Sequence, residues 1–192
     1  MITFTISSIY MSCGQNKPFN PILGETLQGH FADGTKFYCE HTSHHPPISN
    51  FMIEDADGLY TLSGYYEITG KMGANNFISG LRGPNDLIFK DGQHIRFGFP
   101  SYRLGGTVMG ERSIEAIGSC IYEDLTNNNK AVLLMNTFKK TGWIRSTTVG
   151  CKDEINGIIY KATKLVDSKD AIKKNYGKEI EHVYDLCYLK DI

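Results

Sequence analysis

Two adjacent histidines followed by two prolines are the residues of this chain whose types and spacing best suit chemistry. They stand in the octet Glu40-His41-Thr42-Ser43-His44-His45-Pro46-Pro47. Pro46 biases His45 toward extended backbone, and neither proline has an N–H to donate to a strand ladder. A strand arriving through Phe37 and Cys39 must therefore end, or become an edge strand, at His45. At such a strand end both imidazoles can turn toward one spot on the rim of a sheet, where ligands often bind.

Two imidazoles at one spot suit a phosphate group, because each ring can donate a hydrogen bond. A phosphate monoester carries roughly −1.5 to −2 charges at pH 7. Free histidine titrates at about pH 6.5, so a bound phosphate would favour the protonated rings, and binding should weaken as the pH rises well above neutral. The alternative is that both histidines are polar rim residues bonded to backbone carbonyls. A zinc site is a weaker interpretation, because His41, His44 and His45 lack helical i, i+4 spacing and the chain has no Cys-x-x-Cys.

A hydrolase would need a nucleophile, a base and a group that orients the base. Ser43 beside His44, with Glu40 to orient a histidine, offers these residue types. A residue directly adjacent in an extended chain rarely aims its hydroxyl at its neighbour's imidazole, and no Gly-x-Ser-x-Gly sequence is present. We therefore expect a binding protein and not an enzyme.

A second motif lies upstream, in the run Lys17-Pro18-Phe19-Asn20-Pro21-Ile22-Leu23-Gly24-Glu25. Its two prolines, three residues apart, exclude a helix interior and keep the backbone extended. This stiff segment would present Lys17, a cation suited to phosphate, and Asn20, which can donate or accept a hydrogen bond. The alternative is an ordinary proline-rich loop with one solvated lysine.

Both motifs resemble those of the oxysterol-binding protein related family. The octet is similar to E-Q-V-S-H-H-P-P, from which it departs at His41 and Thr42, and the upstream run is similar to K-P-F-N-P-x-L-G-E. Residues 138–143 are a looser match to F-K-x-x-G-W. The resemblance runs from near Ile6 to about Leu165, which is most of the chain.

The resemblance implies a large incomplete β-barrel with a central lipid tunnel. It implies non-vesicular transfer of a phosphoinositide, phosphatidylinositol 4-phosphate, and alternately of a sterol or a phosphatidylserine-like lipid in the same tunnel. A sensor or scaffold that binds without transferring is the alternative. We expect a cytoplasmic protein, peripheral at organelle membranes or membrane contact sites. The residues expected to bind phosphoinositide are Lys17, Asn20, His44 and His45, and those expected to line the tunnel are Ile9, Tyr10 and Trp143.

The whole-chain properties agree with a cytoplasmic binding domain. The 192 residues suffice for one domain with a sizeable core. A net charge of −1 makes binding to nucleic acid through phosphate neutralisation unexpected. Five scattered cysteines favour a reducing compartment over a disulfide framework. No apolar run approaches the roughly 20 residues of a membrane span, and no cofactor or metal is expected.

The patterning predicts a mainly β protein. Apolar residues at Ile2, Ile6, Ile9 and Tyr10 predict a short helix within 1–12. Asp-Gly or Asn-Gly pairs at 33–34, 57–58, 91–92 and 156–157 predict hairpins with type I′ turns. Glycines within the strand patterns, among them Gly64, Gly98 and Gly118, are expected at the corners of a strongly curved barrel. The predicted antiparallel meander has strands near 26–32, 35–43, 48–54, 59–68, 76–81, 86–90, 93–99, 102–109, 112–123, 130–138, 143–151 and 157–165.

The expected organisation is a partial lipid-binding domain over residues 1–192. Residues 1–25 would form the helix and the proline-rich entry segment, residues 26–166 the barrel strands, and residues 167–192 a tail with a possible helix. The domains of the family are roughly twice this length and begin with a lid. The chain is therefore expected to correspond to the barrel core alone.

Overall fold

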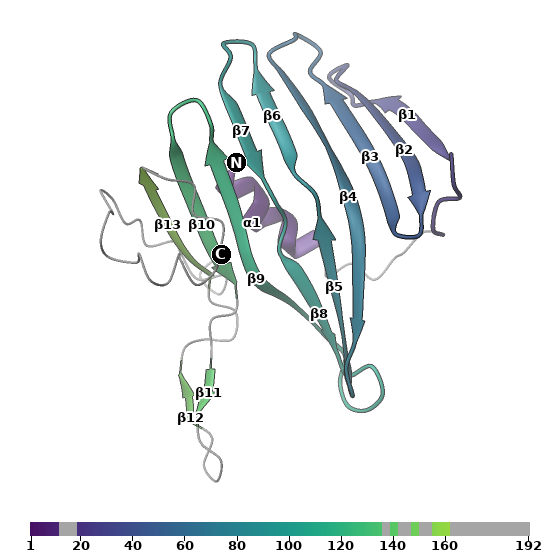
Figure 1. Cartoon of the computed structure of the whole chain (residues 1–192), viewed down its shortest axis with the longest axis vertical. Coiled ribbons are helices and arrows are strands. Elements are labelled where there is room, and N and C mark those ends of the chain that lie inside the picture. The colour runs from purple at the N-terminus through teal and green to yellow at the C-terminus, as the bar shows by residue number, and fades with distance from the viewer. Residues whose placement is uncertain (12–18, 136–138, 142–146, 150–154, 162–192) are drawn as a thin grey trace.

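The structure, a computed structural model, describes residues 1–11, 19–135, 139–141, 147–149 and 155–161. Within these residues it contains one helix and a large antiparallel sheet (Figure 1). A separate two-stranded ladder joins β11 (Lys139–Thr141) to β12 (Thr147–Val149). The other elements are α1 (Ile2–Met11), β1 (Thr26–His30), β2 (Lys36–His44), β3 (Pro47–Glu54), β4 (Tyr60–Met72), β5 (Asn76–Arg82), β6 (Asn85–Phe89), β7 (His94–Phe97), β8 (Ser101–Gly105), β9 (Ser113–Asp124), β10 (Asn129–Met135) and β13 (Ile155–Lys161).

The large sheet is an antiparallel meander in which two strands are interrupted. β5 and β6 lie end to end along β4, since Arg82 pairs with Glu67 and Asn85 with Gly64. β7 and β8 lie end to end along β9 in the same way. In the described part of the chain the edge strands β1 and β13 do not pair with each other, so the sheet stays open. The prediction of a mainly β, incomplete antiparallel barrel is confirmed.

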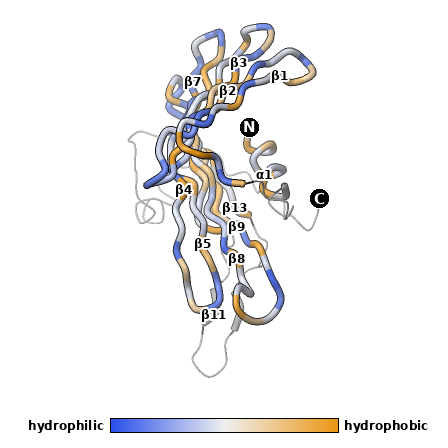
Figure 2. The backbone as a smooth tube through the Cα atoms, turned by 90° about the vertical axis from the view of Figure 1, so that its right-hand side faces the viewer, coloured by the Kyte–Doolittle hydropathy of each residue, from blue (hydrophilic) through white to orange (hydrophobic). Residues whose placement is uncertain are grey.

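The interruptions lie side by side and bend the sheet. A Cβ atom on Gly83, whose φ is +139°, would lie 2.0 Å from the carbonyl oxygen of Tyr65 on β4, so this break requires glycine. A Cβ atom on Gly64 would lie 2.7 Å from the carbonyl oxygen of Pro84, and Gly118 on β9 has a φ of 91°. Figure 2 shows the result, with β1, β2 and β3 bent over relative to β5 and β8. The expected corner role is confirmed at Gly64 and Gly118, whereas a Cβ on Gly98 would meet no atom within 4 Å.

Helix α1 packs on the concave face of the bent sheet (Figure 2). Its buried Ile6 and Ile9 join a core cluster with apolar residues of β6, β7, β9, β10 and β13. The hydroxyl of Tyr122 on β9 donates a hydrogen bond to Thr5 Oγ1, which ties the helix to the sheet. The predicted helix within residues 1–12 is therefore confirmed. Among the described residues no helix is long and apolar enough to cross a membrane.

The hairpin turns at three of the four predicted positions are confirmed, but their predicted type is wrong. Gly34, Gly58 and Gly92 have positive φ, while the aspartates before them do not. In the first turn the Gly34 N–H donates to the Phe31 carbonyl, and Phe31 bonds in turn to Thr35. This is a longer loop that needs only one left-handed residue, a role for which glycine is suited. The pair at 156–157 lies inside β13 and not in a turn. The expected tail helix beyond residue 167 lies outside the described residues.

Candidate phosphate-binding site

A β-bulge near the end of β2 places two histidines on the same face of the sheet. His41 pairs with Ser49 of β3, but Ser43 pairs with Ile48 and His44 with Pro47, so the register shifts between His41 and Ser43. Without this extra residue, His41 and His44 would point to opposite faces. With it, both rings lie on the concave face, with centroids 5.7 Å apart. The strand end predicted near His45 is confirmed, because β2 ends at His44.

Three imidazoles meet at this strand end. The ring of His45 makes an edge contact with that of His44, with centroids 4.8 Å apart, as the two adjacent histidines were expected to do. Nε2 of His41 lies 3.4 Å from Nδ1 of His44, and Nδ1 of His41 lies 2.9 Å from the hydroxyl oxygen of Ser49. His41 is only 4% exposed, whereas His44 and His45 are exposed. The buried ring therefore supports two exposed rings that a ligand can reach.

The proline-rich segment is joined to the same strand end by backbone hydrogen bonds. The Gly24 N–H donates to the His41 carbonyl at 2.8 Å, and the His41 N–H donates to the Glu25 carbonyl at 2.9 Å. The Glu25 carboxylate also accepts from the N–H of Ile22, which closes a turn just before β1. Residues 22–25 are thus held beside β2 at His41, which brings the two sequence motifs next to each other.

The remaining predicted site residues differ in how much the structure describes. Asn20 is exposed in the proline-rich segment. Ile9 is buried in the core cluster under α1, and its contact with a lipid stays a prediction. Lys17 and Trp143 lie outside the described residues, as does the side chain of Tyr10.

An aromatic row crosses the concave face from this site to the helix. Phe51 stacks on Tyr66 at a centroid distance of 4.9 Å, and Tyr66 contacts Phe99 at 5.7 Å. Phe99 contacts Phe97, which stacks on Tyr122 beneath α1. Phe97 and Tyr122 are buried, whereas the first three rings remain partly exposed. The helix therefore covers one part of the concave face and leaves apolar surface uncovered near the histidines.

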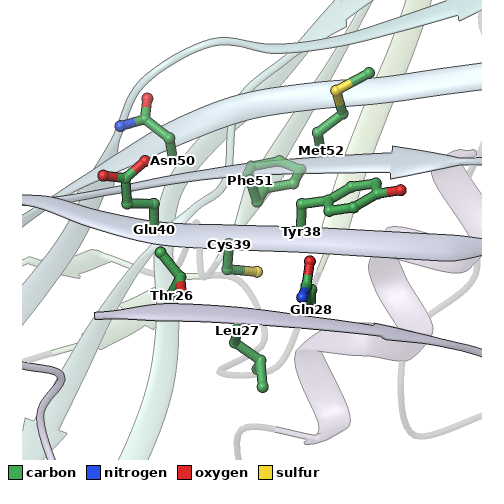
Figure 3. Close-up of a pocket in the computed structure, with 9 residues that line it drawn as sticks. All are labelled: Thr26, Leu27, Gln28, Tyr38, Cys39, Glu40, Asn50, Phe51 and Met52. Carbon is green, nitrogen blue, oxygen red and sulfur yellow. The ribbon is translucent and has the colours of Figure 1, made fainter. Parts of the chain in front are cut away.

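An open cleft of about 370 Å³ lies on the first three strands (Figure 3). Leu27, Cys39 and Phe51 occupy paired positions across β1, β2 and β3 and extend the apolar face to the sheet edge. Tyr38 and Glu40 point to the opposite side of β2. Leu27, Cys39 and Phe51 thus continue the uncovered apolar surface next to the histidine site, whereas most residues that line the cleft belong to the opposite face of these strands.

Burial further disfavours the charged forms of two titratable groups on this face, Tyr66 and Cys39. Burial, with a smaller contribution from Cys39, raises the pKa of Tyr66 to about 12, and burial also raises the pKa of the Cys39 thiol. Both groups are therefore uncharged near neutral pH. An uncharged, partly aromatic surface suits a lipid and offers no activated thiolate.

Comparison with known proteins gives the family of this chain. The model of the family described as "Oxysterol-binding protein" matches residues 1–183. The chain belongs to the oxysterol-binding protein family. Oxysterol-binding protein 9 of Dictyostelium discoideum is 33% identical over 162 residues, and oxysterol-binding protein-related protein 3C of Arabidopsis thaliana is 28% identical over 162 residues. These alignments cover 83% and 84% of the chain but only 38% and 34% of the two relatives, so the chain spans less than two fifths of their length.

Solved structures of oxysterol-binding protein family domains share the fold. The Osh1 ORD domain in complex with ergosterol is 25% identical with a TM-score of 0.67, covering 84% of this chain and 37% of that one. The Osh3 ORD of Saccharomyces cerevisiae, in complex with PI(4)P, is 24% identical with a TM-score of 0.57, covering 76% of this chain and 41% of that one. The likeness supports the incomplete lipid-binding barrel.

The described geometry gives no support to a hydrolase or a zinc site at these histidines. Glu40 lies on the face opposite His41, and the described hydrogen bonds of His44 run to His41 and not to Ser43. Among the described residues no group of three or more histidine, cysteine, aspartate or glutamate side chains is placed to hold a metal ion. The arrangement is thus suited to binding.

Sequence reasoning missed the supporting role of His41 and Ser49. The contact of His41 with Ser49 depends on the cross-strand register and its contact with His44 depends on the bulge, and the sequence specifies neither. The sequence differs from the family motif at His41, but this difference alone does not indicate that His41 supports His44.

Proposed function

We propose that this chain binds phosphatidylinositol 4-phosphate and transfers it between membranes in alternation with a sterol or another lipid. The observation that carries the proposal is the cluster of His41, His44 and His45 at the end of β2, beside the proline-rich segment. Two exposed imidazoles at one point can donate hydrogen bonds to a phosphate group. Relatives solved with PI(4)P and with sterols support the two ligand classes.

The headgroup site uses residues from both motifs. His44 and His45 hold the ring phosphate, and Lys17 and Asn20 contact the inositol phosphate from the neighbouring segment. A hydrogen bond to a charged group contributes about 1.5–3 kcal/mol. The site requires no basic field over the whole molecule, which agrees with a net charge of −1.

The apolar part of the ligand lies on the concave face. The uncovered aromatic positions Phe51, Tyr66 and Phe99 lead from the histidines toward α1, and Leu27 extends the surface to the edge strand. A lipid tail or a sterol would bury this apolar surface. Because one concave face serves both ligands, their binding is mutually exclusive, as exchange requires.

The experiment that tests the proposal is extraction of phosphatidylinositol 4-phosphate from liposomes by the wild type and by His44→Ala/His45→Ala. Losing two charge-assisted contacts should lower the affinity by well over tenfold. His30→Ala is a matched control. His30 is also an exposed histidine in a strand, but it ends β1 at the end of the sheet away from His44 and His45. Equal extraction by all three proteins contradicts the headgroup assignment.

A lipid sensor or scaffold is the second candidate, favoured by the open concave face. An open face can admit a lipid without sequestering it from water. A time course of lipid movement between donor and acceptor vesicles separates the two functions. Binding without movement would favour the sensor, and movement faster than the spontaneous rate would favour transfer.

A further inference from the structure

The two ends of the sheet differ in the side chains that their turns carry. Antiparallel connections alternate between the ends, so the turns β1–β2, β3–β4, β6–β7 and β9–β10 share one end (Figure 1). We call it the acidic end, because each turn there contains or follows an aspartate: Asp33, Asp57, Asp91 and Asp124. The opposite end carries the turns β2–β3, β4–β5 and β8–β9, and we call it the histidine end after His44 and His45.

Three apolar side chains are exposed around the β4–β5 and β8–β9 turns of the histidine end. Met72 ends β4 and is 71% exposed. Val108 and Met109 lie in the β8–β9 loop and are 73% and 76% exposed. Such exposure of neighbouring apolar side chains is typical of a surface that contacts a protein or a membrane.

The β8–β9 loop is held in a defined shape by the neighbouring turn. Asn75 Oδ1 accepts hydrogen bonds from the N–H of Val108 at 2.8 Å and from that of Met109 at 3.0 Å. Asn75 Nδ2 donates to the Met109 carbonyl at 2.8 Å. One side chain thus satisfies three backbone groups of the loop and fixes the turn of β4–β5 to it. The apolar side chains are presented on a preorganised tip.

A close crossing at the base of the loop adds to its definition. Gly106 has a φ of +65°, and a Cβ atom there would lie 2.0 Å from the carbonyl oxygen of Glu111. Only glycine allows the two arms of the loop to approach this closely. The tip therefore comprises Met72, Val108 and Met109, held by Asn75 and Gly106.

The charges around the tip favour an anionic surface as its partner. Lys71 and Arg112 are exposed at the two flanks of the tip, with Glu111 as the acidic residue of the loop. The acidic end lies at the far side of the sheet, where its aspartates would be repelled by the same surface. Anionic membranes attract lysine and arginine at their surface within about one Debye length.

We propose that this tip inserts into the surface of a lipid bilayer and orients the histidine end toward the membrane. The inference rests on the proposed function, since a headgroup site needs to face the bilayer that contains its lipid. β4 pairs with the first residues of β3 at Glu67 and then continues to Met72, past the level of the β2–β3 turn. The tip would therefore reach the bilayer first, with His44 and His45 above its surface.

Flotation with vesicles of phosphatidylcholine and phosphatidylserine, free of phosphoinositide, tests the tip. Val108→Ser/Met109→Gln removes the apolar groups without adding charge. Because burial of one side chain of this size changes an affinity by about tenfold to a hundredfold, the variant should bind vesicles at least tenfold more weakly. Leu59→Gln is the matched control, because Leu59 is 54% exposed at the acidic end and should not contact the membrane.

The flanking charges give a second measurement on the same vesicles. Lys71→Gln/Arg112→Gln should weaken binding by about fivefold per residue and reduce its dependence on ionic strength. Lys90→Gln, in the β6–β7 turn of the acidic end, should have no such effect. Equal losses in both variants would contradict the proposed orientation.

Three outcomes would overturn the inference. The first is that the wild type does not bind these vesicles, and the second is that the tip variant floats as well as the wild type. The third is a lower melting temperature of the tip variant, which would show that Val108 and Met109 pack against polypeptide. A water-soluble short-chain phosphoinositide separates this inference from the proposed function. Its binding depends on the histidines and not on the tip, so loss of vesicle flotation with intact binding of the soluble ligand is the expected result for the tip variant.

Discussion

The acidic end and the histidine end of the sheet are built by different interactions. At the acidic end an aspartate closes each turn, and further hydrogen bonds, such as those from the Ala56 N–H to Thr35 Oγ1 and from Gln93 to Asp124, join neighbouring turns. Asp33 accepts from the Thr35 N–H, and Asp55 accepts from the N–H groups of Asp57 and Leu59. At the histidine end the β8–β9 loop depends on Asn75, a partner distant in the chain. Aspartate side chains thus close the turns of the acidic end from within, whereas the β8–β9 loop takes its closing side chain from another turn.

The difference suggests a division between stability and function. Turns that satisfy their own backbone groups can be optimised for folding without affecting a ligand. The β8–β9 loop can expose Met109 because Asn75 fixes its shape, and β2 can expose His44 because the buried His41 contacts its ring. Substitutions at the acidic end should therefore change stability alone, and those at the exposed histidine end should change binding alone.

His41 provides the largest expected departure from this division, because it is buried at the histidine end. His41→Ala removes the support of His44 and leaves the Ser49 hydroxyl without its partner. We expect the free energy of unfolding to fall by about 2 kcal/mol and phosphoinositide binding to weaken by about tenfold. Chemical denaturation and titration with a short-chain phosphoinositide measure the two effects.

The matched variant for His41 is His41→Gln, which introduces the residue of the family motif. Glutamine can still donate and accept hydrogen bonds at this position. Binding and stability should both lie closer to the wild type than in His41→Ala. A normal affinity in His41→Ala would show that His44 needs no support from the buried ring.

The sequence predicted the strands well because their patterns are local. The ten-residue spacing of turn residues and the runs of β-branched and aromatic residues specified β1 to β10 to within a few residues. The sequence Gly83-Pro84-Asn85 predicts a turn between two paired strands, which is wrong, because β5 and β6 do not pair with each other. That these strands continue one another along β4 follows only from the pairing of Arg82 and Asn85.

The candidate site was predictable in part, through its motifs. The residue types and spacing of the adjacent pair His44 and His45, together with the proline-rich segment, were enough to indicate phosphate binding. The bulge that aligns His44 with His41 was not predictable, because a one-residue register shift depends on hydrogen bonds between strands. The predicted turn type was wrong for a related reason: Asp33 uses its side chain to close a longer loop, which the pair Asp-Gly alone does not reveal.

A prediction of intermediate size concerns the acidic end. Asp55→Ala removes the acceptor of two backbone N–H groups in the β3–β4 turn. Because the turn is exposed and water can replace the lost bonds in part, we expect the free energy of unfolding to fall by about 1 kcal/mol. Thermal unfolding measures this loss. Lipid binding should be unchanged, and a weaker affinity for phosphoinositide would contradict the separation of the two ends.

The smallest expected effect lies between the two ends, at Asp86 on β6. Burial opposes its ionisation, but hydrogen bonds from Arg96 and His94 outweigh burial and lower the pKa of Asp86. A carboxylate whose pKa is lowered in the folded protein stabilises the fold at pH values above its pKa in the unfolded chain, about 3.9. This contribution is lost as the pH falls through its pKa in the folded protein.

Asp86→Asn isolates that contribution. At pH 6 the variant should be less stable than the wild type by about 0.5 kcal/mol, the scale of a partly exposed ion pair. As the pH falls below about 4, the difference in the free energy of unfolding should shrink, because the wild type also loses its charge. Melting curves of both proteins across this range measure the difference. A difference that stays constant with pH would mean that Asp86 acts through its shape and neutral hydrogen bonds, and that the stability of this strand does not depend on its charge.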